Sequence, residues 1–164
     1  FDQMGIGTVK AWFCGSRLQN KSLPTAHSWA IFSDDKPVGV VERKYITDVI
    51  SRPYPQVIAG NINEFSFDFA TRTFRMDFMT DNKKGSSVLF IPADRYYPDG
   101  FSVIVNDDLV LFHNSLKNTG LEATVSFKSY SPANFIWDPY KQHLTILKWP
   151  DDQIRTNLKI VPGY

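Results

Sequence analysis

The chain has 164 residues, enough for one ordinary domain or for one domain and a fragment of another. Aromatic residues make up 15% of it, and thirteen Phe lie among β-branched residues, a composition that favours β-sheet over a helix bundle. Eighteen Lys and Arg nearly balance seventeen Asp and Glu, without a basic run, so nucleic acid is not an expected partner. No apolar stretch approaches the roughly 20 residues of a transmembrane helix.

The beginning of the chain indicates processing and secretion. It starts Phe1-Asp2-Gln3-Met4, with neither an initiator Met nor an apolar leader, so we expect an amino terminus made by processing or trimming. Asn20-Lys21-Ser22 is a glycosylation sequon, which predicts a glycan on Asn20 and a secreted or endolysosomal protein. Cys14 is the only cysteine and has no disulfide partner in this chain, so it is either an apolar filler or a link to another chain.

Residues 1 to 60 are predicted to contain one strand, one long connection and one helix. Gly7 to Phe13 has the composition of a short buried strand, and apolar residues recur at helical spacing from Val41 to Ser51. The irregular stretch between them, which includes Trp29, is longer than a structural connector normally is. Arg52-Pro53-Tyr54-Pro55 closes this part, since two prolines forbid a continuing helix.

From residue 61 to 164 the pattern changes to the period of two that is typical of strands. Two alternating runs flank Ala70-Thr71-Arg72, which predicts a hairpin with Phe65, Phe67, Phe74, Met76 and Phe78 facing a core. Turn-forming residues separate further expected strands. These lie at Ser87 to Ile91, Phe101 to Val105, Leu109 to Phe112, Ala123 to Phe127, His143 to Trp149 and Leu158 to Val161. The fold class is therefore mainly β, with an antiparallel β-sandwich.

The junction also carries a family resemblance. Arg52-Pro53-Tyr54-Pro55-Gln56-Val57-Ile58-Ala59-Gly60, followed by Phe65-Ser66-Phe67-Asp68, resembles the boundary between barrel and sandwich in endoglycoceramidase-like enzymes of glycoside hydrolase family five. Phe90-Ile91-Pro92 with Tyr97-Pro98-Asp99-Gly100-Phe101, and the final Leu158 to Pro162, are similar to sandwich strands of that family. The resemblance covers nearly all of residues 40 to 164 and, more loosely, residues 1 to 40.

The resemblance implies that residues 1 to 60 end a (β/α)8 barrel, with Gly7 to Phe13 as strand eight and Val41 to Ser51 as helix eight. It also implies that Trp12 binds substrate by stacking on a sugar, since barrel active sites lie at the carboxyl ends of the strands. The catalytic carboxylates would lie upstream of Phe1. We therefore expect a partner, an upstream barrel chain of the same precursor, because one strand and one helix cannot close a barrel.

No catalytic residue is expected within the chain. Asn63-Glu64 resembles the Asn-Glu pair that carries the acid/base in this family. It follows the last barrel helix, however, and lies at the start of a sandwich strand, so Glu64 is expected to be an exposed strand residue. The pairs Asp34-Asp35, Asp107-Asp108 and Asp151-Asp152 are predicted to be turns. His27, His113 and His143 have no metal-ligand spacing, and neither a metal nor a cofactor is expected. Trp137 and Trp149 are predicted to pack in the core.

The expected function is therefore the carboxyl-terminal part of a secreted glycoside hydrolase, with a glycan or glycolipid of the oligosaccharide-ceramide type, or a related β-glycoside, as substrate. The chain alone is expected to be inactive. Two alternatives stay open. One is a noncatalytic sugar-binding or lipid-binding module, and the other is a structural or storage protein derived from a hydrolase.

Overall fold

The computed structural model describes residues 32–33, 41–113 and 134–163. The chain divides into two compact units, with residues 7–52 in one of them. In that unit the described elements are an antiparallel pair of short strands, β1 (Phe32–Ser33) and β2 (Val41–Glu42), and the helix α1 (Lys44–Ile50). The expected helix thus begins three residues late, because its first two residues pair with β1. Among the described residues no helix is long and apolar enough to cross a membrane.

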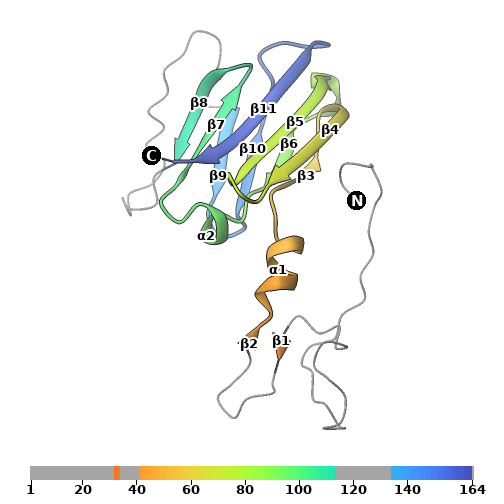
Figure 1. Ribbon diagram of the computed structural model, residues 1–164. Helices are drawn as coiled ribbons and strands as arrows, with labels where there is room; N and C mark the ends of the chain where they lie inside the picture. Colours follow the sequence, from red (N-terminus) through yellow and green to blue (C-terminus); the bar gives the residue numbers. More distant parts are fainter. Residues whose placement is uncertain (1–31, 34–40, 114–133, 164) are drawn as a thin grey trace. The chain divides into compact units, whose positions relative to one another are not determined.

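The other unit is a sandwich of two antiparallel sheets, which confirms the expected fold class (Figure 1). The four-stranded sheet has the order β3-β6-β10-β9, and the five-stranded sheet has the order β4-β5-β11-β7-β8. The strands are β3 (Tyr54–Val57), β4 (Gly60–Asp68), β5 (Thr73–Thr80), β6 (Ser87–Phe90), β7 (Phe101–Val105), β8 (Asp108–His113), β9 (Phe135–Asp138), β10 (His143–Ile146) and β11 (Arg155–Pro162). The short helices η3 (Asn82–Lys84) and α2 (Ala93–Tyr96) lie on either side of β6 in the sequence.

The hairpin of β4 and β5 forms around the expected turn. Arg72 adopts a left-handed conformation there, with φ 53°, and the Asp68 carboxylate accepts a hydrogen bond of 2.8 Å from the Ala70 backbone N–H. On β5 the alternation is as predicted, because Phe74, Met76 and Phe78 are all buried in the core. The intervening side chains on β5 therefore face away from the core.

The aromatic side chains of β4 are less buried than those of β5. Phe65 and Phe67 pack against the core but are only partly buried, and Phe69, which continues the alternation, is 47% exposed. The cause is the position of β4, which is the edge strand of its sheet and is paired only with β5. The inward direction predicted for Phe65 and Phe67 is confirmed, but full burial is not reached.

Trp149 connects the two sheets. Its fully buried ring lies 4.8 Å from that of Phe78 on the five-stranded sheet, measured between ring centroids. Its indole N–H donates a 3.0 Å hydrogen bond to the Ser87 hydroxyl on the four-stranded sheet. The side chain of Asn82 holds the Trp149 backbone by donating to its carbonyl at 3.0 Å and accepting from its N–H at 2.9 Å. Core packing of Trp149 is thus confirmed.

The remaining expected strands agree with the structure to different degrees. β6, β7 and β8 lie close to their predicted bounds, β10 ends at Ile146 instead of reaching Trp149, and β11 begins earlier than Leu158. The expected strand at residues 123–127 lies outside the described residues. Two strands of the described sandwich, β3 and β9, were not predicted. Because β3 pairs with β6, the sandwich begins at Tyr54, upstream of the expected boundary at residue 60.

Truncation of buried and half-buried aromatic residues tests this register. Phe78→Ala should lower the free energy of unfolding by about 3 to 5 kcal/mol, since the ring is fully buried. Phe67→Ala should cost roughly 1 to 2 kcal/mol, because its ring removes less apolar surface from water. Urea denaturation of both variants gives the comparison. A larger cost for Phe67 than for Phe78 would contradict the register of β4 on β5.

Candidate functional site

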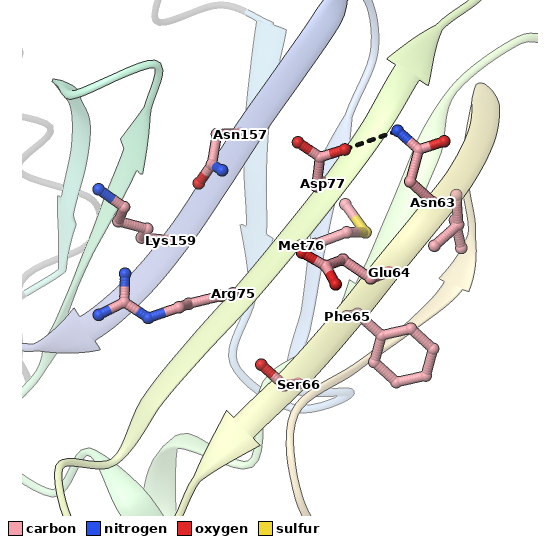
Figure 2. Close-up of a pocket in the computed structure, with 10 residues that line it drawn as sticks. Asn63, Glu64, Phe65, Ser66, Arg75, Met76, Asp77, Asn157 and Lys159 are labelled. Carbon is pink, nitrogen blue, oxygen red and sulfur yellow. Dashed lines mark hydrogen bonds between the residues drawn. The ribbon is translucent and has the colours of Figure 1, made fainter. Parts of the chain in front are cut away.

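A hollow of about 750 Å³ lies on the outer face of the five-stranded sheet, over β4, β5 and β11 (Figure 2). Seven polar side chains line it. One is Asn63, and the other six come two from each strand: Glu64, Ser66, Arg75, Asp77, Asn157 and Lys159. The volume lies within the range of about 300 to 1,000 Å³ that is usual for small-molecule sites. The hollow is therefore the candidate site on the described part of the sandwich.

The pairing of the three strands arranges these six side chains in two rows. In one row Arg75 lies between Ser66 of β4 and Lys159 of β11. In the other row Asp77 lies between Glu64 and Asn157. Directly opposite residues in an antiparallel sheet have Cβ atoms about 4.5 to 5.5 Å apart, so neighbours within a row can interact or share a ligand.

A β-bulge shapes one end of the hollow. The register between β4 and β5 shifts between Ile62 and Glu64, which leaves Asn63 as an extra residue. Its side-chain amide donates a 2.6 Å hydrogen bond to the Asp77 carboxylate (Figure 2). Bulges re-aim side chains and are frequent near functional sites. Here the bulge brings Asn63 and Glu64 to the same side of the strand pair as Asp77.

The Asp77 carboxylate, which lines the hollow, is buried and hydrogen-bonded. It is 6% exposed and accepts two hydrogen bonds from Arg155 Nε, at 2.9 and 3.1 Å, besides the bond from Asn63. The bond from Asn63 and then the Arg155 guanidinium hold the pKa of the Asp77 carboxyl below its ordinary value. Asp77 is thus ionised, and its hydrogen bonds hold the side chains of Asn63 and Arg155 in place.

The charged side chains around Asp77 differ in whether they have a hydrogen-bond or ion-pair partner. Lys159 Nζ lies 2.7 Å from Asp107 Oδ1, and this contact lowers the pKa of Asp107. In contrast, Glu64 and Arg75 make no side-chain hydrogen bond or ion pair with any described residue, although both line the hollow. The hollow thus presents one open carboxylate acceptor and one open guanidinium donor.

The outer face of the four-stranded sheet carries an aromatic row instead. Tyr54, Phe90 and His143 lie opposite one another on β3, β6 and β10. The rings of Tyr54 and Phe90 are 5.3 Å apart and tilted by 43°, and those of Phe90 and His143 are 6.2 Å apart at 82°. Because the rings are not coplanar, they do not form a flat stacking platform.

Most residues with possible catalytic or metal chemistry have structural roles. Glu64 lies exposed on β4, as expected. Asp107 and Asp108 lie at the turn between β7 and β8, where Asn106 and Asp107 have left-handed φ, and Asp151 and Asp152 lie in bends before β11. Within the described ranges no three His, Cys, Asp or Glu side chains gather as a metal site. Trp137 is buried with its ring 5.0 Å from Phe101, which confirms core packing.

The site residues expected from the sequence were Trp12 for substrate binding, Asn20 for glycosylation and Cys14 for an interchain disulfide. All three lie outside the described residues, so they stay predictions. The hollow was not found from the sequence. The alternation of Arg75 and Asp77 with apolar residues indicated that these two side chains lie on the outer face of the sheet. Nothing in the sequence indicated that β11 pairs with β5.

Comparison with known proteins defines the class of this chain. Residues 52–160 match the model of the glycoside hydrolase family 5 C-terminal domain, and the chain belongs to this family. An endoglycoceramidase from Hydra vulgaris is 31% identical over 58 residues, which are 34% of this chain and 11% of that protein. These matches confirm the family resemblance of the junction and of the sandwich.

Solved structures of endo-glycoceramidase II from Rhodococcus sp. share the fold. Its complex with a five-membered iminocyclitol aligns with 83% of this chain at 14% identity and a TM-score of 0.52. Its complex with a cellobiose-like isofagomine aligns with 83% at 15% identity and a TM-score of 0.51. The chain corresponds to only 24% and 23% of those two structures, respectively.

The lowered pKa of Asp77 predicts a pH-dependent contribution to stability. A carboxyl group whose pKa is lower in the folded than in the unfolded state stabilises the fold above the ordinary value of 3.8, and this stabilisation is lost as the pH falls through the lowered value. Asp77→Asn should therefore be less stable than the wild type at pH 7, with a difference that shrinks below about pH 4. Urea denaturation between pH 3 and 7 measures it. Asp99→Asn, which changes an exposed aspartate outside the hollow, is the control for the loss of one carboxylate.

Proposed function

We propose that this chain is the carboxyl-terminal part of a secreted or endolysosomal glycoside hydrolase that acts on glycolipids of the oligosaccharide-ceramide type or on related β-glycosides. The observation that carries the proposal is the membership of residues 52–160 in the glycoside hydrolase family 5 C-terminal domain. The endoglycoceramidase relative and the shared fold support the substrate class. The chain corresponds to about a quarter of the solved relatives (23% and 24%), which is consistent with a larger enzyme.

In this proposal the sandwich does no bond cleavage. A retaining glycosidase needs two carboxyl groups about 5 to 5.5 Å apart, one of them with a raised pKa so that it can donate a proton. Glu64 and Asp77 are the cross-strand carboxylate pair of the hollow, but the pKa of Asp77 is lowered and its oxygens are occupied by Asn63 and Arg155. Asp77 therefore cannot be the acid, and the catalytic carboxylates are assigned to an upstream barrel.

The residues that precede β3 would provide the end of that barrel. Gly7 to Phe13 would be strand eight, Val41 to Ser51 would include helix eight, and Trp12 would stack on a sugar at the carboxyl end of the strand. Asn20 would carry a glycan. The upstream strands would come from another part of the precursor, with Cys14 available for a link between chains.

A second candidate function is a noncatalytic sugar-binding module. The hollow on the five-stranded sheet favours it, because open hydrogen-bonding groups in a concave site are suited to a polar ligand. This candidate predicts that the chain binds sugar by itself, whether or not a barrel accompanies it.

The activity of the purified chain distinguishes the roles. The chain alone should not hydrolyse glycolipids or aryl glycosides, whereas the same chain together with the upstream barrel should hydrolyse them. Measured turnover by the chain alone that disappears in Glu64→Gln would contradict the assignment, and inactivity of the combined protein would favour a storage or structural role.

The partner is tested on the native assembly. Intact-mass analysis of the native protein should show a second polypeptide, and cross-links should connect residues 7 to 13 with it, because a single barrel strand needs neighbours on both edges. Deletion of residues 1 to 52 serves as a control, since it should abolish the association while leaving the sandwich folded. A native protein that contains this chain as a monomer without a barrel would refute the partner and favour the sugar-binding module.

A further inference from the structure

We propose that the hollow on the outer face of the five-stranded sheet binds a neutral, hydroxyl-rich glycan, with Glu64 and Arg75 as its main polar contacts. The proposal goes beyond the catalytic function proposed above, because it needs neither a barrel nor its carboxylates. It rests on the sugar-binding module given there as the second candidate function and names the ligand and the contacts of that site. It rests on the charge balance, the open hydrogen-bonding groups and the shape of the hollow.

The charge balance favours a neutral ligand. Asp77 is paired with Arg155 and Lys159 with Asp107, so these four charges compensate one another within the sheet. The charge of Glu64 interacts with that of Arg155 and the charge of Arg75 with that of Asp68, so the two side chains, one of each sign, add no net charge to the hollow. An anion in the hollow would lie near Glu64 and Asp77, and a cation would lie near Arg75 and Lys159. Neither sign of ligand charge is therefore favoured over the whole hollow.

The open polar groups match the chemistry of sugar hydroxyls. A carboxylate only accepts hydrogen bonds and a guanidinium only donates them, so Glu64 and Arg75 together need a ligand that does both. Hydroxyl groups do both, and neighbouring hydroxyls on a sugar ring can meet both oxygens of a carboxylate or two N–H groups of a guanidinium. The side chains of Ser66 and Asn157, which also line the hollow, add a donor and an acceptor each.

The shape and rigidity of the hollow fit the same ligand. Its volume of about 750 Å³ is within the range that is usual for small ligands. Hydrogen bonds to the Asp77 carboxylate hold Asn63 and Arg155 in place before a ligand binds. A preformed site lowers the entropic cost of ordering side chains on binding. Figure 2 shows Glu64 and Arg75 projecting from neighbouring strands on the same side of the sheet.

Saturation-transfer difference NMR tests the proposal on the whole chain, together with any polypeptide that co-purifies with it. Lactose and cellobiose serve as neutral probes, and N-acetylneuraminic acid serves as a sugar of similar chemistry that carries a carboxylate. We expect saturable binding of at least one neutral sugar. Glu64→Gln and Arg75→Gln should each weaken it about tenfold or more, because each replaces the charged partner of a hydrogen bond with a neutral amide. Arg72→Gln, in the turn of the same hairpin and outside the hollow, should not change it.

The possible results separate this proposal from the catalytic one. Binding that survives both hollow variants unchanged would place the sugar elsewhere, for example on a barrel, and would overturn the proposal without affecting the proposed enzyme. Absence of binding, or binding restricted to N-acetylneuraminic acid that depends on Arg75 but not on Glu64, would also overturn it. Loss of binding in both hollow variants, with Arg72→Gln unchanged and with wild-type urea midpoints for all three, would support it.

Discussion

The fold depends most on how the buried indole of Trp149 is accommodated. A buried indole contributes a large apolar area but brings an N–H group whose desolvation is costly unless an acceptor is present. Ser87 supplies that acceptor, and the same hydroxyl oxygen accepts a 2.9 Å hydrogen bond from the backbone N–H of Ala59. One oxygen thus uses both of its lone pairs to connect Trp149 with β6 and with the segment in which the chain leaves β3 for β4. The contact of Trp149 with Phe78 then places β5 over this point.

The hollow follows from the same packing. Side chains on a strand alternate between two faces, so a shift of one residue would exchange Arg75 and Asp77 with Phe74, Met76 and Phe78. The burial of those three apolar side chains therefore fixes which face carries the charged ones. The register of β11 on β5 is fixed in a similar way, because Leu158 and Ile160 are also fully buried. The burial of apolar side chains on one face of β5 and β11 therefore determines that the polar rows of the hollow lie on the other face.

Several features could be predicted from the sequence because they depend on local physics. The period of two on β4 and β5 and the turn at Arg72 need only neighbouring residues, and both were predicted correctly. The family motif was also predictive, and the structure gives part of its physical reason. Ala59 is fully buried, and a Cβ at Gly60 would collide with the backbone oxygen of Met79. Small residues are therefore required at this crossing between the sheets.

Other features depend on contacts between distant parts of the chain and left no local signal. β3 was missed because Pro53 and Pro55 argue against a strand, and edge strands are the ones that tolerate proline. β9 was missed because its 4 residues are too short a run to show a period of two clearly. The hollow needs β4, β5 and β11 side by side, and the pairing of β11 with β5 cannot be deduced from alternation alone.

The central place of β11 also affects when the sandwich can form during synthesis. β11 lies between β5 and β7, so the five-stranded sheet consists of two separate parts until residues 155–162 have left the ribosome. At about 5 to 20 residues per second, the ribosome needs roughly 5 to 20 seconds to advance from Gly60 to Arg155. Once β5 and β7 have been made, one edge of each strand exposes unpaired backbone groups until β11 pairs with both, and other strands can bind these groups. The five-stranded sheet is therefore completed only by the last strand of the chain.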